Sequence, residues 1–250
     1  MVLKVLLAAC IIAVSSPAFA EIINGGFEDN NLNGWTTSGT TAITSAGFDV
    51  RTVGVLPMVG VGTHSAKVGD ENAFNYISPD PSSIAQTWTL GATSTTLYFG
   101  WAAVGLVPDD SGVHALNETP SVQINVNDVT GGGAVNLFTQ EYYTGNLGSI
   151  SPGWFAGASQ SGRGPLGQVD AGVWYYRPWE TFQLDVTGLT GRDLQVTLAT
   201  RDCAFGGHAS YAYFDRFGDT GPVINTPEPG TLFLLGFGFL GLGWVRRLKK

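Results

Sequence analysis

Cysteine, histidine and cationic side chains are all scarce in this 250-residue chain. It has two cysteines and three histidines, and 12 Lys and Arg residues stand against 20 Asp and Glu residues. Between residues 21 and 225 the only cysteine is Cys203, which excludes an internal disulfide there. The same segment holds 19 acidic and 7 basic residues, a net charge of about −12. Such a surface repels nucleic acid, and we expect no nucleic-acid partner.

Catalytic motifs are missing as well. The chain contains no G-x-S-x-G or H-E-x-x-H sequence, and no motif pairs two carboxylates for glycoside hydrolysis. We therefore expect a non-catalytic protein. An extracellular polysaccharide hydrolase and a purely structural adhesin are the alternatives.

Helical periodicity is nearly absent, and short alternating runs separated by Gly, Asn, Asp, Ser and Pro take its place. Val122, Ile124 and Val126 alternate with polar residues, as in a sheet with one wet face. Seven strands are predicted, at residues 85–90, 95–102, 121–126, 136–142, 180–186, 194–200 and 210–217. This number of strands predicts an all-β protein, an antiparallel β-sandwich. The Gly-rich, Pro-rich and Ser-rich segment from Gly145 to Arg177 is expected to form long loops.

The N-terminal residues carry an export pattern. Lys4 gives a positive start, Val5 to Val14 form an apolar core, and Ala18-Phe19-Ala20 is an A-x-A cleavage site. We predict a signal peptide at residues 1–20 and a mature chain that begins at Glu21. The sequence before Cys10 is similar to a lipoprotein box, but too few apolar residues precede it for lipidation.

The C-terminal residues form a second, three-part pattern. The turn Pro227-Glu228-Pro229 precedes an apolar run from Thr231 to Val245, and Arg246 and Arg247 begin a basic end. The prolines hold an extended segment that an enzyme can read. The apolar run is expected to form a hydrophobic helix. With about 15 residues it is shorter than the ~20 that cross a bilayer comfortably.

This order of motif, apolar run and basic end resembles the PEP-CTERM sorting tail of Gram-negative bacteria. The resemblance implies recognition by an exosortase-type enzyme, a transient tether in the inner membrane through the C-terminal helix, and delivery after cleavage to the cell surface or extracellular matrix. An ordinary tail anchor is the alternative. The expected organisation is a signal peptide at 1–20, a β-sandwich at 21–225 and a sorting segment at 226–250.

Four segments of the middle part resemble galactose-binding-like β-jelly-rolls, the fold of many carbohydrate-binding modules. They are Ile22 to Trp35 (I-I-N-G-G-F-E-D-N-N-L-N-G-W), Pro57 to Val68, Ile84 to Trp101, and Tyr211 to Asp215. The resemblance implies a jelly-roll sandwich. It also implies binding to exopolysaccharide or another glycan.

In that fold the first and last strands lie close together, and many members hold a structural Ca²⁺ there. Glu28 on the first strand and Asp215 on the last match the positions concerned. Ca²⁺ requires about 6–8 oxygen ligands from carboxylates and backbone carbonyls. The alternative is that Glu28 caps turn amides and that Asp215 pairs with Arg216 or Arg51.

Aromatic residues are concentrated near the predicted long loops. Exposed aromatic rings are suited to stacking on sugars, and Arg177 could bond their hydroxyls. The alternative is that these rings fill the core. The candidate glycan-binding residues are Trp154, Trp174, Tyr175, Tyr176 and Trp179.

Cys203 and His208 form a C-x4-H pair that raises two further possibilities. Zinc needs three or four N or S ligands, and the spacing of a closed structural site is missing. A nucleophilic Cys–His dyad has no supporting motif around it. We interpret Cys203 as a small buried hydrophobe, with an intermolecular bridge or a reactive thiol as alternatives.

Overall fold

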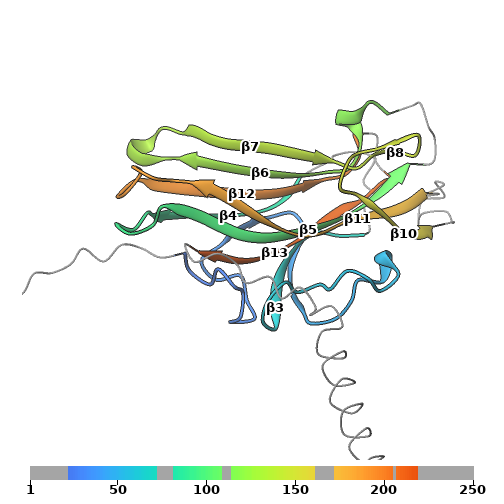
Figure 1. Cartoon of the computed structure of the whole chain (residues 1–250), viewed down its shortest axis with the longest axis horizontal. Helices are drawn as coiled ribbons and strands as arrows, with labels where there is room; N and C mark the ends of the chain where they lie inside the picture. Colours follow the sequence, from blue (N-terminus) through green and yellow to red (C-terminus); the bar gives the residue numbers. More distant parts are fainter. Residues whose placement is uncertain (1–21, 72–80, 109–113, 161–171, 205–206, 219–250) are drawn as a thin grey trace, which may run out of the picture.

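The structure is a computed structural model that describes residues 22–71, 81–108, 114–160, 172–204 and 207–218. In these residues the chain folds into two antiparallel sheets packed face to face (Figure 1). This confirms the predicted all-β sandwich. The predicted signal peptide at 1–20 and the sorting segment at 226–250 lie outside the described residues. No helix in the described part of the chain has the length and apolar character needed to cross a bilayer.

The first sheet has five strands in the order β1-β4-β12-β6-β7, and the second has six in the order β10-β11-β5-β13-β3-β2. The strands of the first are β1 (Thr36–Ser38), β4 (Ser82–Thr89), β12 (Asp193–Arg201), β6 (Ser121–Asp128) and β7 (Val135–Tyr143). Those of the second are β10 (Phe155–Gln160), β11 (Gly172–Asp185), β5 (Thr96–Pro108), β13 (Ser210–Gly218), β3 (His64–Gly69) and β2 (Thr41–Ser45). A small hairpin, β8 (Gly145–Asn146) and β9 (Ser149–Ile150), and three short 3₁₀ turns complete the described part: η1 (Val50–Thr52), η2 (Leu116–Glu118) and η3 (Thr130–Gly132).

All seven predicted strands are present, and two local predictions are wrong. Residues 23–34, expected to begin the fold as a strand around Glu28, form consecutive turns. The expected loop from Gly145 to Arg177 contains β10 and the first part of β11. Strand β11 continues through this region because it pairs with β5 along nearly its whole length. A long partner strand thus outweighs the turn-like composition.

The main hydrophobic core fills the space between the two sheets. In β5 the side chains of Leu97, Phe99 and Trp101 point inward and meet the aliphatic rows of β6 and β12. One end of this core is aromatic. Phe99 stacks on Phe182 with ring centroids 4.4 Å apart, and on Phe217 at 4.6 Å. Burial of these large rings provides much of the hydrophobic stabilisation of the sandwich.

A second core lies on the opposite face of the six-stranded sheet. Val104, Leu106 and Tyr213 alternate with the inward residues of their strands and pack against Leu56, which lies in the segment that follows η1. Asp49 at the start of η1 is also buried there. Its Oδ2 accepts hydrogen bonds from the hydroxyls of Tyr211 at 2.8 Å and Tyr213 at 2.7 Å. The η1 segment is therefore bound to the sheet by apolar packing and a buried polar network.

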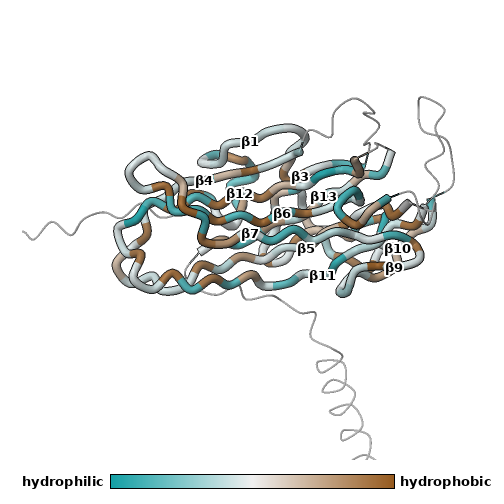
Figure 2. The backbone as a smooth tube through the Cα atoms, turned by 90° about the horizontal axis from the view of Figure 1, so that it is seen from above, coloured by the Kyte–Doolittle hydropathy of each residue, from teal (hydrophilic) through white to brown (hydrophobic). Residues whose placement is uncertain are grey.

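The outer face of the five-stranded sheet is polar. Along β12, β6 and β7, brown and teal residues alternate in Figure 2, which follows from one face being buried and the other wet. The outward residues are mostly amides and hydroxyls, such as Gln123, Asn125, Gln195 and Thr197. The two sheets therefore differ: one carries a polar outer face, and the other is covered by the η1 segment.

Candidate functional site

Glu28 lies in the turns that precede β1 and reaches the segment leading into β3. Its carboxylate accepts hydrogen bonds from the Thr63 amide at 2.9 Å, the Thr63 hydroxyl at 2.6 Å and the His64 amide at 3.3 Å. Burial raises the pKa of Glu28, but the hydrogen bonds from Thr63 and His64 outweigh it and hold the pKa below its ordinary value. The carboxylate is therefore ionised at neutral pH. The expected capping of turn amides is present.

Asp215 lies on β13 and is only 2% exposed. Its Oδ2 accepts a hydrogen bond from the Val61 amide at 2.8 Å, and its Oδ1 is buried without a hydrogen-bond partner among the described residues. Burial, together with the nearby charge of Glu28, raises the pKa of Asp215 to about 7. None of the ion pairs between described residues includes Asp215, so the alternative of pairing with Arg51 or Arg216 is wrong.

Strained backbone stands directly beside both carboxylates. Phe27, before Glu28, has a φ of 56°, and Arg216, after Asp215, has a φ of 54° at an irregularity in the β13 ladder. Residues other than glycine rarely adopt these left-handed values, and such outliers are concentrated at ligand clamps and active sites. Gly62 approaches Glu28 closely, because a Cβ on Gly62 would lie 2.1 Å from Glu28 Oε1.

Glu28 and Asp215 would supply two of the about six to eight oxygen ligands that Ca²⁺ requires. Glu28 and Asp215 come from distant parts of the chain, yet Glu28 lies near enough for its charge to act on Asp215. A loop backbone passes beside both carboxylates, with the Val61 amide bonded to Asp215 and the Thr63 amide bonded to Glu28. One carboxylate oxygen, Asp215 Oδ1, is buried and unsatisfied by the part of the chain that the structure describes. A bound cation would satisfy this oxygen and offset the repulsion between the two charges.

The five predicted glycan-binding aromatic residues do not form one surface. Trp154 is 6% exposed and Trp174 is fully buried, so neither presents a ring to solvent, and the prediction is wrong for these two. Trp174 also donates its indole N–H to Gln160 Oε1 at 2.7 Å. Tyr175 packs against the core between the sheets. The alternative interpretation, that these rings fill the core, applies to these three residues.

Trp179 and Arg177 are also engaged within the protein. Trp179 donates its indole N–H to the Pro57 carbonyl at 2.8 Å, and its ring lies against Gly60. The Arg177 guanidinium pairs with Glu180 and lies over the ring of Trp101, 5.3 Å from its centroid. Both side chains are partly buried and have partners within the protein.

One aromatic pair does face solvent. Phe155 on β10 is 54% exposed, and its ring centroid lies 6.0 Å from that of the half-buried Tyr176 on β11. Phe155 is not among the residues predicted from the sequence, because its exposure depends on the pairing of β10 with β11. Composition does not encode that pairing, and the sequence carries no signal that separates the exposed Phe155 from the buried Trp154 beside it.

A shallow depression lies on the outer face of the five-stranded sheet. It is lined by Pro81, Ser121, Gln123, Glu141, Ala199, Thr200 and Arg201. Glu141 is its central group, and it accepts hydrogen bonds from Ser121 Oγ at 2.7 Å, Tyr143 Oη at 2.6 Å and Arg201 at 2.5 Å. A carboxylate, a guanidinium and an amide side by side can bind neighbouring sugar hydroxyls. No sequence motif indicates this group, because its residues come from three strands.

The Cys203–His208 pair is in contact. Cys203 is fully buried, which confirms its interpretation as a buried residue, and its Sγ lies 3.2 Å from His208 Nδ1. A third group, His114, lies beside them. Sequence spacing gave no reason to associate it with the pair.

Comparisons with known proteins identify the C-terminal segment and give likenesses for the remainder. Residues 225–247 match the PEP-CTERM protein-sorting motif, which confirms the predicted sorting pattern around Pro227, Glu228, Pro229, Arg246 and Arg247. No curated protein matches the chain.

Among solved structures the chain is similar to TmCBM61, described in complex with beta-1,4-galactotriose, with 12% identity, coverage of 80% of this chain and 96% of that one, and a TM-score of 0.41. It is also similar to CBM27-1 of Caldicellulosiruptor saccharolyticus (11% identity, 78% and 94% coverage, TM-score 0.39) and to the K2 cleaved adhesin domain of Lys-gingipain (13%, 81% and 97%, 0.38). Likenesses at this level assign no ligand. The identity that the comparisons do establish is that of the tail: the chain ends in a PEP-CTERM protein-sorting motif.

Proposed function

We propose that the chain is an exported, non-catalytic surface or matrix protein whose β-sandwich binds glycan. The observation that carries the export and sorting part of the proposal is the PEP-CTERM sorting motif at residues 225–247, and the exposed aromatic pair described below supports the glycan part. An exosortase-type enzyme would cleave near Pro227-Glu228-Pro229, after a transient tether of residues 226–250 in the inner membrane. The released body would then reach the exopolysaccharide layer.

The sorting step can be tested by cell fractionation in a Gram-negative host that has an exosortase. The wild-type protein should be recovered from the surface or medium without its C-terminal peptides, as measured by mass spectrometry. Replacing Pro227, Glu228 and Pro229 by alanine should leave the intact chain in the inner membrane. Equal release of both proteins would contradict the proposal.

The Phe155–Tyr176 pair is the proposed glycan platform. Phe155 on β10 is 54% exposed and lies beside Tyr176 on β11, which adds a second ring and a hydroxyl. Aromatic faces offer an apolar surface to the C–H face of a sugar ring, and the hydroxyl can bond to a sugar oxygen. A single pair gives weak binding, which suits a protein retained in a layer that offers many repeats of the same ligand.

Affinity electrophoresis in gels that contain the exopolysaccharide of the producing cell tests this platform. The wild-type protein should be retarded, and Phe155→Ala with Tyr176→Ala should migrate as in a gel without polysaccharide. Leu116→Ala is the matched control, because Leu116 is 53% exposed elsewhere on the surface. Arg201→Ala tests the polar depression. Loss of retardation in that variant alone would place the glycan on the five-stranded sheet instead.

A structural Ca²⁺ held by Glu28 and Asp215 completes the proposal. The buried, unsatisfied Oδ1 of Asp215 and the adjacent strained backbone support it. The ion would stabilise the junction between the turns before β1 and the last strand.

A second candidate function is adhesion through protein contact, and a specific surface favours it. The loop around η1 exposes four apolar side chains, which we call the apolar loop: Phe48 (61%), Val50 (79%), Val53 (66%) and Val55 (55%). Grouped exposed apolar residues of this kind often mark interaction surfaces. If serine substitutions at Val50 and Val55 abolish cell or matrix adhesion while polysaccharide retardation is unchanged, adhesion through the apolar loop is the better description.

A further inference from the structure

The register of the sheets brings two distant connections together at one end of the sandwich. Ser210 at the start of β13 pairs with Gly105 near the end of β5, and Arg201 at the end of β12 pairs with Ser121 at the start of β6. The connection from β5 to β6 and the connection from β12 to β13 therefore both pass from one sheet to the other at this end. His114 lies in the first connection, and Cys203 and His208 lie in the second.

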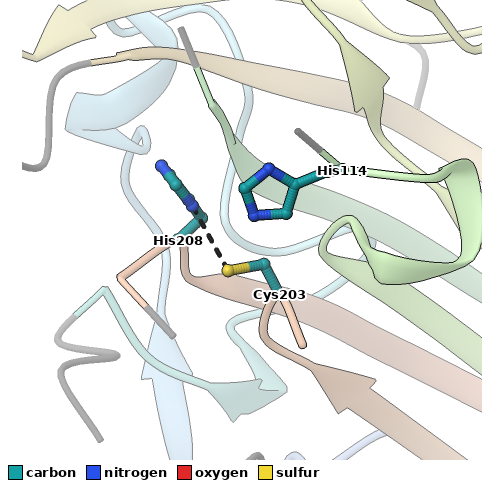
Figure 3. Close-up of side chains that lie close together, drawn as sticks. All are labelled: His114, Cys203 and His208. Carbon is teal, nitrogen blue, oxygen red and sulfur yellow. Dashed lines mark hydrogen bonds between the residues drawn. The ribbon is translucent and has the colours of Figure 1, made fainter. Parts of the chain in front are cut away.

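The three side chains converge, as Figure 3 shows. One ligand atom from each, an imidazole nitrogen of His114, the Sγ of Cys203 and an imidazole nitrogen of His208, lie within 4.8 Å of one another. Cys203 and His114 are buried, and His208 is half-buried. The closest pair is Cys203 Sγ and His208 Nδ1, at 3.2 Å, and the two histidine rings stand edge to face with centroids 5.6 Å apart.

The backbone holds these residues in place. The Cys203 amide donates to the His208 carbonyl at 3.0 Å and closes the loop between them, and Gly207 turns it with a φ of 86°. The Ala204 amide donates to the Glu118 carbonyl at 2.9 Å, which joins this loop to η2. On the other side, Asn146 donates its side-chain amide to the His114 carbonyl at 2.7 Å. The described parts of the two connections are thus hydrogen-bonded to each other, and His114 is bonded to the β8–β9 hairpin.

We infer that His114, Cys203 and His208 form a binding site for a transition-metal ion of the Zn²⁺ or Cu⁺ type. Two imidazoles and one thiolate are the soft and borderline donors that these ions prefer, whereas Ca²⁺ takes oxygen ligands. In a tetrahedral zinc site, neighbouring donor atoms lie about 3.3–3.6 Å apart. The separation of 3.2 Å between Cys203 Sγ and His208 Nδ1 is slightly shorter than this range, and the widest separation, up to 4.8 Å, has to close by roughly 1 Å. Three protein ligands leave a fourth position for water or another ligand.

A catalytic dyad and simple core packing both account for the cluster less well. A nucleophilic Cys–His dyad needs a thiolate that a substrate can reach, and Cys203 is fully buried. A role in packing alone would account for a buried cysteine, but it gives no reason for two of the three histidines of the chain to converge on that cysteine. The metal site is independent of the proposed glycan and calcium sites, because it shares no residue with them.

The test is a Co²⁺ titration of the full chain, purified in detergent with a metal-free reductant and freed of metal by chelator. The wild-type protein should bind one Co²⁺ and show a thiolate-to-cobalt charge-transfer band in the near ultraviolet. Zn²⁺ or Cu⁺ should then displace the cobalt, and which of them does so at lower concentration identifies the preferred ion. Cys203→Ser should abolish the band, and His114→Gln or His208→Gln should weaken Co²⁺ binding at least tenfold.

The chain supplies matched controls for both ligand types. His64→Gln replaces the one histidine outside the cluster, and Cys10→Ser replaces the other cysteine; both variants should bind Co²⁺ as the wild type does. Near-ultraviolet circular dichroism checks that each variant is folded. If a variant fails to fold, cysteine alkylation of the folded wild type gives a second measurement, since bound Zn²⁺ should slow it at least tenfold. An absent band, or a band that persists in Cys203→Ser, would overturn the inference.

Discussion

Substituting Asp215 by asparagine gives a direct test of the calcium proposal, because it removes a charge without changing shape. Burial, and secondarily the charge of Glu28, raises the pKa of Asp215 from 3.8 to about 7 in the folded protein. Between pH 4 and pH 7 the folded state therefore holds a proton that the unfolded state has lost. Stability without metal falls as the pH rises through this interval. At 1.36 kcal/mol per pH unit, Asp215 alone removes roughly 4 kcal/mol by pH 8.

Asparagine is neutral at every pH, so Asp215→Asn avoids this loss. In chelator at pH 8 the variant should be more stable than the wild type by up to roughly 4 kcal/mol, and at pH 4 the two should be nearly equal. For a domain of this size the difference at pH 8 corresponds to a Tm roughly 10 °C higher. Addition of Ca²⁺ should raise the Tm of the wild type at pH 8, because the ion binds the ionised carboxylate. The variant should not respond.

The assay is thermal unfolding followed by tryptophan fluorescence, at pH 4, 6 and 8, with chelator or with Ca²⁺. Asp202→Asn is the matched control. Burial also raises the pKa of Asp202, to about 6, so this variant should flatten part of the pH profile and keep the Ca²⁺ response. Equal stability of wild type and Asp215→Asn in chelator at pH 8 would refute the reasoning about burial. An equal Ca²⁺ response in both would remove Asp215 from the metal site.

Three further predictions concern stability and can be measured by urea unfolding at pH 7. Val53→Asn should stabilise the fold by about 1 kcal/mol, because Val53 is exposed at a left-handed φ of 53° that a β-branched residue tolerates poorly and asparagine tolerates well; a loss of stability would contradict this. Gly69→Ala should cost more than about 2 kcal/mol, because its φ is 83° and a Cβ would lie 2.4 Å from the Ser210 carbonyl oxygen; a near-neutral effect would mean that the two strands separate easily. Asp49→Ala should cost about 3 kcal/mol, because it leaves two buried tyrosine hydroxyls without their acceptor; a loss under about 1 kcal/mol would indicate that water replaces the carboxylate.

The strands are predictable because their signal is local. In β6, Val122, Ile124 and Val126 alternate with polar residues and lie buried in the structure, so the pattern indicates both the strand and its inward face. The segment at 172–179 is not predictable in the same way. Its strand depends on pairing with β5, and its two faces are both partly covered, so the period-2 pattern is weak there.

The candidate sites differ in how they could be found. The family resemblance predicts that Glu28 and Asp215 lie close together, although the prediction of a strand at Glu28 is wrong. The prediction of an aromatic platform is wrong for Trp154 and Trp174, which are buried. A tryptophan in the sequence looks the same whether its ring faces a sugar or the core. Burial is set by tertiary packing, and only the structure separates the exposed Phe155 from its buried neighbour.

The cluster of His114, Cys203 and His208 shows the limit of spacing arguments most clearly. The C-x4-H pair has no further candidate ligand close to it in the sequence. This counts against a zinc site only if a single loop has to supply every ligand. In this sandwich, strands of the two sheets terminate at the same end of the molecule. Connections that are far apart in the sequence therefore lie close together there. If candidate ligands are counted over all the connections that meet at one end of the sandwich, instead of along one stretch of sequence, His114 is found as the third proposed ligand. Asp215, on which the charge of Glu28 acts, lies nearer the opposite end of β13 from Ser210, so the two proposed metal sites lie toward different ends of this strand.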